Sequence, residues 1–156
     1  MRIVIVAVGH RQPAWVNEAF NDYARRMPHA ARIELIEVKP EPRISGKTPM
    51  QLMQAEAQRI RAVLPQGAQL VTLDGKGKEF DSGGFARWLA AAQSDGRDLA
   101  MVIGGADGLA DEIKARADAS LALSRFTLPH GLARVVLAEQ LYRAVSLLAN
   151  HPYHRE

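Results

Sequence analysis

The stretch "LAMVIGGADG", residues 99–108, joins a short apolar run directly to a glycine-rich loop. Five consecutive apolar residues are typical of a buried strand. The glycines that follow either form a tight turn that needs positive φ or let the backbone approach a ligand closely. In a parallel sheet, ligands bind just beyond the carboxyl ends of the strands, so this loop is a first candidate for a functional site.

The same alternation of strand and helix extends to both sides of this stretch. Short apolar runs predict strands at 2–8, 32–38, 68–74, 99–103 and 119–124. Helical periodicity predicts helices at 14–27, 49–64, 83–94, 109–117 and 132–149, with Thr48 and Ser82 as caps of the second and third. The intervening loops of interest are 39–47, 75–82 and 125–131. This pattern predicts one α/β domain over residues 1–156, with a mostly parallel sheet flanked by helices.

The composition narrows the chemistry that the chain can perform. Its 156 residues are 47% hydrophobic and 24% charged, and they include no cysteine. Disulfides, thiolate metal sites and a cysteine nucleophile are therefore excluded. The N-terminal apolar run of seven residues is too short for a membrane span, which needs about 20 residues. We expect a soluble, cytoplasmic protein with no membrane partner.

The net charge of +3 comes from the first third of the chain. Residues 1–50 contain eight Lys or Arg and five Asp or Glu, whereas 51–100 and 101–156 each balance six against six. Such a surplus indicates either an ordinary solvated face or a polyanionic partner. The cations concerned are Arg25, Arg26, Arg32, Lys39, Arg43 and Lys47.

Two loops at expected strand ends differ in the ligand they suit. "IGGADG" (103–108) lacks the GxGxxG spacing, and Asp107, Asp111 and Glu112 near the next helix start would repel a phosphate. This loop suits a ligand without phosphates. "LSRFTLPHG" (123–131) could wall an apolar slot, and its His130 is either a structural residue at a helix start or a catalytic one.

The end of the chain, "NHPYHRE" (150–156), allows three interpretations. His151 and His154 could bind a metal, but further ligands would have to come from Glu156 and the remote His130. The segment could be a disordered tail. It could also be a docked, functional end, because tyrosine, histidine and arginine stack on bases and hold phosphate.

Together these motifs resemble one family. "VAVG" (6–9), "TLD" (72–74), "IGGADG", "LSRFTLPH" (123–130), "AEQLYRA" (138–144) and "NHPYHRE" occur in the order and spacing of the RlmH family. Its members are SPOUT-class methyltransferases that act on the N3 position of a pseudouridine in large-subunit (23S) ribosomal RNA. The resemblance spans almost the whole chain.

The resemblance implies a fold, an assembly and a cofactor. The fold would contain a deep trefoil knot in its C-terminal half, and the protein would be a homodimer. The cofactor would be S-adenosyl-L-methionine, and no metal would be required. The residues implied in cofactor binding are Leu73, Gly104, Gly105, Leu123, Ser124, Arg125, Phe126, Thr127 and Leu128.

Methyl transfer to N3 requires a site that weakens the N3–H bond, holds the ring and aligns it in line with the methyl group. We expect Tyr153 to orient the nucleobase and His154 to act as general base or hydrogen-bond partner. Arg155 and Arg143 would hold a phosphate or a ring oxygen. His130 is a second candidate base. The sequence leaves open whether the C-terminal segment completes its own pocket or a partner's.

The substrate is expected to be the large-subunit RNA within the ribosome, because a net charge of +3 gives only weak binding to naked RNA. Two alternatives remain at this stage. One is a non-enzymatic ribosome- or RNA-binding factor, and the other is a small nucleotide-binding regulator, which the acidic helix start disfavours.

Overall fold

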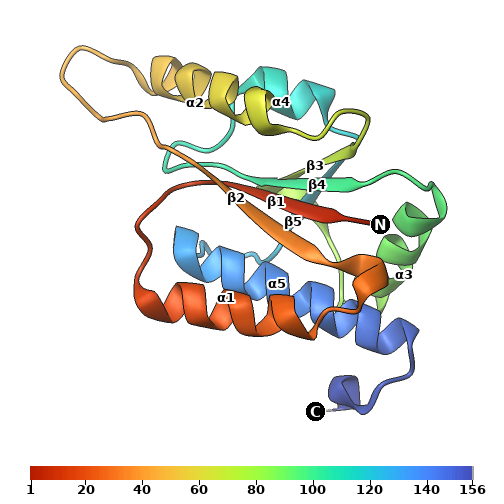
Figure 1. Cartoon of the computed structure of the whole chain (residues 1–156). Helices are drawn as coiled ribbons and strands as arrows, with labels where there is room; N and C mark the ends of the chain where they lie inside the picture. Colours follow the sequence, from red (N-terminus) through yellow and green to blue (C-terminus); the bar gives the residue numbers. More distant parts are fainter. Residues whose placement is uncertain (156) are drawn as a thin grey trace.

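A five-stranded parallel sheet lies between two layers of helices in the computed structural model, which describes residues 1–155 (Figure 1). The strand order is β2-β1-β4-β3-β5, so β2 and β5 form the edges and β1, β4 and β3 lie inside the sheet. Strands and helices alternate along the chain as predicted. Their bounds are β1 (Ile3–Val8), α1 (Ala14–Arg26), β2 (Ile33–Val38), α2 (Pro49–Val63), β3 (Gln69–Glu79), α3 (Ser82–Ser94), β4 (Leu99–Ile103), α4 (Asp111–Arg116), β5 (Ala119–Ala122) and α5 (His130–Leu148). Two short 3-10 helices, η1 (His29–Ala31) and η2 (Pro152–Arg155), were not predicted.

Both faces of the sheet are covered, which explains why its inner strands are continuous apolar runs. In β1, Ile3, Ile5 and Ala7 pack against α1, α3 and α5, while Val4 and Val6 pack against α2 and α4. All six residues of β1 are buried. Among residues 1–155, no helix combines the length and the apolar character that crossing a membrane requires.

The loop predicted at 75–82 is wrong, because β3 continues to Glu79. The two glycines in "GKGKE" are typical of a loop, but Gly77 lies against β5. A Cβ atom on Gly77 would lie 2.6 Å from the carbonyl carbon of Leu121. The pairing register shifts between Leu73 and Lys78, so β3 passes β5 with an irregularity rather than ending there.

The predicted caps are half correct. Thr48 caps α2 as expected: its hydroxyl accepts from the Gln51 amide at 3.2 Å, and its own amide donates to the Gln51 side chain. Ser82 is not the cap of α3 but its first residue. Asp81 caps this helix by accepting from the Gly84 amide at 2.6 Å.

Two boundaries near the C-terminus also move. The last helix begins at His130 rather than at residue 132, because Pro129 supplies a fixed φ directly before the first turn. The fifth strand ends at Ala122 rather than at residue 124, so Leu123 and Ser124 belong to the loop that follows. That loop lies at the edge of the sheet where the carboxyl ends of β3 and β4 also lie.

Candidate functional site

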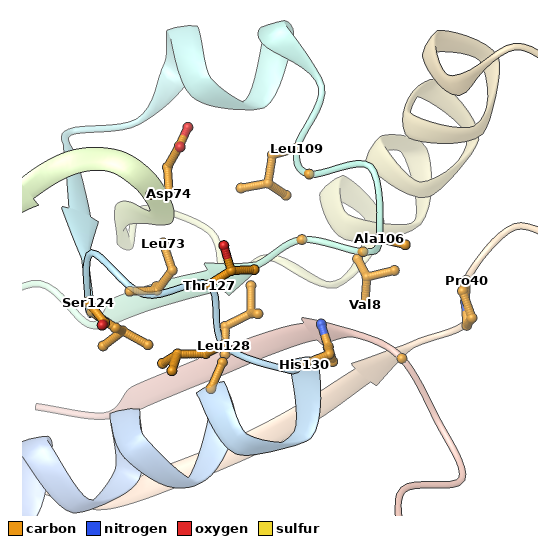
Figure 2. Close-up of a pocket in the computed structure, with 18 of the residues that line it drawn as sticks. Val8, Pro40, Leu73, Asp74, Ala106, Leu109, Ser124, Thr127, Leu128 and His130 are labelled. Carbon is orange, nitrogen blue, oxygen red and sulfur yellow. The ribbon is translucent and has the colours of Figure 1, made fainter.

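A pocket of about 780 Å³ opens at the carboxyl ends of β1, β4 and β5, beside residues 73–75 in the middle of β3 (Figure 2). Its size is that of a site for a small organic ligand. All nine residues predicted to bind a cofactor line it, and so does His130. Of the further lining residues, Ile103, Ala106 and Gly108 belong to the glycine-rich loop that the sequence indicated as a candidate site. The others were not assigned to cofactor binding: Val8, Gly9, His10, Gln12, Pro40, Asp74, Gly75, Leu109, Lys114 and Ala133.

The glycine loop, residues 104–108, is both a tight turn and a pocket wall. The Gly108 amide donates to the Gly105 carbonyl at 3.0 Å, and Gly108 has a φ of +87°. A Cβ on Gly104 would lie 2.8 Å from the carbonyl carbon of Gly108. The two interpretations of this loop are therefore compatible, because the turn itself brings the backbone to the pocket.

Acidic groups around the pocket are placed differently from expectation. Asp107 does not belong to the start of α4; it pairs with Arg43 at 2.8 Å. Asp74 lies in the pocket wall, where it accepts from the Lys76 amide at 3.0 Å and pairs with Lys114 at 3.2 Å. The Lys76 amide and then the Lys114 ammonium hold the pKa of Asp74 below its usual range, so its carboxylate stays charged near neutral pH.

His130 begins α5 and points into the pocket (Figure 2). Burial is the main cause of its lowered pKa, and the Arg134 guanidinium adds to the effect. The positive end of the α5 dipole also disfavours a charged imidazole. Its Nε2 atom is buried and has no hydrogen-bond partner within residues 1–155. His130 is therefore a neutral imidazole at the pocket wall, with its Nε2 atom packed beside Gly9.

Arg134 supports this wall from below and was missed by sequence reasoning. It is fully buried, one turn after His130, and donates to the Gly9 carbonyl at 3.0 Å and to Glu37 at 2.8 Å. Gly9 leaves room for both side chains, because a Cβ there would lie 3.1 Å from Arg134 and from His130. The sequence signal for Arg134 was an arginine within an otherwise apolar stripe of the last helix.

The other predicted catalytic residues lie elsewhere, at the C-terminal end of α5 (Figure 1). The Tyr153 hydroxyl donates to Glu139 at 3.0 Å, and Arg143 pairs with the same carboxylate at 2.7 Å. The Arg143 guanidinium lies 5.1 Å from the centre of the Tyr153 ring, which also contacts the Tyr142 ring at 4.6 Å. His154 and Arg155 belong to η2 in the same segment.

The α5 helix separates these two sets of residues. Arg143 lies about 20 Å along this helix from His130, and the Tyr153 hydroxyl reaches back to Glu139, about 14 Å along the helix from His130. The C-terminal segment is docked on the fold, as the third interpretation of "NHPYHRE" expected, but it does not line the pocket of its own chain. Burial, followed by hydrogen bonds with Tyr23 and Glu139, raises the pKa of Tyr153.

The metal interpretation gains no support from the part of the chain that the structure describes. Over residues 1–155, no three histidine, aspartate or glutamate side chains come together as ligands would. The His151 Nδ1 atom instead accepts from the Tyr153 amide at 3.2 Å. Glu156, the other suggested ligand, lies outside the described residues.

The cations of the first third do not form one patch. Arg25 and Arg26 pair with Asp22 on α1, and Arg26 also lies 5.9 Å from the centre of the Tyr142 ring, beside the C-terminal segment. Arg32 pairs with Glu34. Lys39, Arg43 and Lys47 follow β2, next to the pocket residue Pro40.

Comparison with known proteins gives the class of this fold. A family model described as "Predicted SPOUT methyltransferase" matches residues 1–154. The probable methylase family protein from Haemophilus influenzae Rd KW20 is 16% identical, with a TM-score of 0.53 over 97% of this chain and 69% of that one. A structure described as "Structural insights into the 2-OH methylation of C/U34 on tRNA" is 17% identical, with a TM-score of 0.52 over 96% of this chain and 98% of that one. At this identity the two structures show the fold alone: that of a SPOUT methyltransferase.

The family within this class follows from closer relatives. The ribosomal RNA large subunit methyltransferases H of Burkholderia ambifaria (strain MC40-6) and Burkholderia multivorans (strain ATCC 17616 / 249) are each 54% identical over 155 residues, or 99% of both chains. The chain therefore belongs to the RlmH family of SPOUT methyltransferases.

Proposed function

We propose that the protein transfers a methyl group from S-adenosyl-L-methionine to N3 of a pseudouridine in the large-subunit (23S) ribosomal RNA. The observation that carries the proposal is identity over the full chain to enzymes named ribosomal RNA large subunit methyltransferase H. We infer that it acts in the cytoplasm, on the assembled ribosome, because a net charge of +3 favours a substrate recognised by shape as well as charge.

The pocket fits the proposed cofactor by its chemistry. Leu73, Leu109 and Leu128 supply apolar walls suited to a flat ring, and the glycine loop brings the backbone close. Asp74 and Lys114 lie in the pocket wall as an ion pair, so this part of the wall offers a phosphate little net positive charge. When bound, S-adenosyl-L-methionine supplies a methyl group activated by a positively charged sulfur.

Residues of the protein would prepare the nucleobase for methyl transfer. The N3 proton of pseudouridine has to be removed or weakened before the nitrogen lone pair can react. His130 is already neutral in the pocket, which suits a proton acceptor. Tyr153 would orient the base, His154 would accept or share the proton, and Arg143 with Arg155 would stabilise negative charge on ring oxygen or phosphate.

A homodimer would bring the pocket residues of one subunit together with the C-terminal residues of the other. Arg143, Tyr153, His154 and Arg155 do not line the pocket of their own chain, and the Tyr153 hydroxyl is bonded to Glu139, about 14 Å along α5 from His130. We infer that this segment reaches a pocket more readily on a partner subunit than on its own. We infer a site in which one subunit contributes the pocket and the other contributes Tyr153, His154 and Arg155. Isologous contact would create two such sites in each dimer.

We also infer a deep trefoil knot in the C-terminal half. Membership of the SPOUT class supports it, as does the close pairing of β3 with β5 beside the loops that line the pocket. A crystal structure traced from residue 69 to the end of α5 tests it. A traced chain path that could be drawn out straight from its two ends would exclude the knot.

Methyl transfer to ribosomes tests the proposed function. Ribosomes from cells lacking this protein are incubated with it and radiolabelled S-adenosyl-L-methionine, with protein-free 23S RNA as the comparison. Label at N3 of a large-subunit pseudouridine, stronger on ribosomes than on free RNA, is expected. Binding to ribosomes without label would instead indicate a non-enzymatic factor, and equal label on free RNA would contradict the ribosomal context.

A further inference from the structure

The segment that follows β2, residues 39–48, forms a strap across one side of the pocket. Pro40 lies in the pocket wall (Figure 2). Its neighbours are held to α2, because the Arg59 side chain donates to the Lys39 carbonyl at 3.0 Å and pairs with Glu41. Arg43 extends the strap to the glycine loop by pairing with Asp107. The strap thus connects α2 with a loop that follows the distant strand β4.

Beneath the strap lies Glu56, a buried carboxyl group of α2 that the proposed reaction does not use. It is 7% exposed, and its Oε2 atom accepts from the Glu41 amide at 3.0 Å. It forms no ion pair within residues 1–155. Burial raises the pKa of Glu56, and the neighbouring Asp107 adds to the effect. A buried acid without a cationic partner is costly, so its position calls for a reason.

The other side of the Glu56 carboxyl lies against the glycine loop. A Cβ atom on Gly105 would lie 2.9 Å from its Oε1 atom and 3.3 Å from its Oε2 atom. Glu56 therefore contacts the residue after Pro40 on one side and Gly105 on the other. Both Pro40 and Gly105 line the pocket, so this one carboxyl group lies between two walls of the pocket.

We propose that Glu56 is a positioning residue that holds the strap and the glycine loop at the separation that cofactor binding requires. The surface ion pairs of the strap cannot fill this role alone, because the Arg43 and Arg59 side chains are 59% and 39% exposed and are screened by solvent. The Glu41–Glu56 hydrogen bond has a buried acceptor and joins the strap to α2, while the same carboxyl group packs against Gly105 of the glycine loop. This inference rests on the proposed use of the pocket for S-adenosyl-L-methionine.

Two substitutions separate positioning from a general effect on folding. Glu56→Gln keeps an acceptor for the Glu41 amide, whereas Glu56→Ala removes it. By titration calorimetry with S-adenosyl-L-methionine, the alanine variant should bind about tenfold more weakly, which is the size of one lost buried hydrogen bond. The glutamine variant should stay within about twofold of wild type. Should the alanine variant not fold, Glu56→Met keeps the side-chain volume without a good acceptor and takes its place.

Ile60→Val is the matched control, because Ile60 lies one turn further along α2, is buried in the core and does not line the pocket. It should lower the unfolding temperature and leave cofactor affinity unchanged. Equal affinity in wild type and in the alanine or methionine variant would overturn the inference.

A second readout requires no cofactor. Amide hydrogen exchange at Glu41 and across residues 104–108 should become faster in Glu56→Ala and stay slow in Glu56→Gln. If wild type does not bind S-adenosyl-L-methionine, the proposed function fails, while the exchange experiment still tests the role of Glu56. Unchanged exchange in the glycine loop would show that Glu56 does not position it.

Discussion

His130 lies where the N-terminus of α5 meets the end of β1 and the glycine loop. Its surroundings include the Arg134 guanidinium, the Glu37 carboxylate and the backbone of Gly104. Burial and Arg134 outweigh Glu37, which explains a pKa below the ordinary value of 6.5. The two interpretations of this histidine from sequence, structural or catalytic, describe one residue whose structural burial keeps it neutral and so able to accept a proton.

This environment predicts a dependence of stability on pH. Because the pKa of His130 is lower in the folded than in the unfolded state, the unfolded chain takes up a proton first as pH falls. The free energy of unfolding should therefore decrease as the pH falls below about 6.5, and less so in His130→Gln. Denaturant unfolding across this range measures it, and NMR titration of the His130 ring should give a midpoint below 6.5. An unchanged pH profile in the glutamine variant would contradict this account.

At the scale of elements, the pairing of β3 with β5 depends on a missing side chain. Gly75 and Gly77 lie two residues apart in β3, but only the second is in contact with the β5 backbone. A Cβ on Gly75 would meet no atom within 4 Å of it, whereas one on Gly77 would overlap the Leu121 backbone. The two glycines are thus a natural pair of test and control.

Gly77→Ala should lower the free energy of unfolding by about 1–3 kcal/mol, because the two strands have to move apart. Gly75→Ala should cost little, since its methyl group meets open space. Urea denaturation of both variants measures the difference. Equal stability of the two would mean that β3 and β5 pair less closely than the structure indicates.

The elements recognisable from sequence are those with local signals. The buried strand at 2–8 and the helix capped by Thr48 each carry an apolar pattern or a cap within a few residues. The end of β3 carries no such local signal. Its two glycines are typical of a loop, and β5, with which β3 pairs, lies more than forty residues further along the chain. The cap of α3 was misplaced by one residue because Asp81 and Ser82 are both good capping residues.

The site could be predicted in part for the same reason. Loops after parallel strands converge at one edge, so the glycine loop and residues 123–128 were found together. Pro40 lines the pocket, and Arg134 supports its wall, only through long-range packing that no local pattern encodes. A helix over 132–149, about 27 Å long, already separates His130 from residue 150 along the chain. The return of Tyr153 onto Glu139 has no local signal in the sequence.

At the scale of the whole molecule, the proposed site depends on two subunits. A dimer of one His154→Ala subunit and one Ser124→Trp subunit tests this, since the tryptophan is meant to fill the pocket. Each homodimer should be inactive. The heterodimer, purified by two different tags, should keep one intact site of two and so about half of wild-type activity. An inactive heterodimer would show that each C-terminal segment serves its own subunit, and calorimetry confirms that Ser124→Trp no longer binds cofactor.

The strand order also determines when the pocket can exist during synthesis. β1 and β2 are made early and pair with each other, but β1 has to wait for β4, and the pocket needs residues 73–75 of β3, the loops after β4 and β5, and His130. A nascent chain that has not yet released α5 from the ribosomal exit tunnel therefore lacks the pocket. Such an incomplete chain cannot compete for the cellular pool of methyl donor, and catalytic competence is acquired only in the last moments of translation.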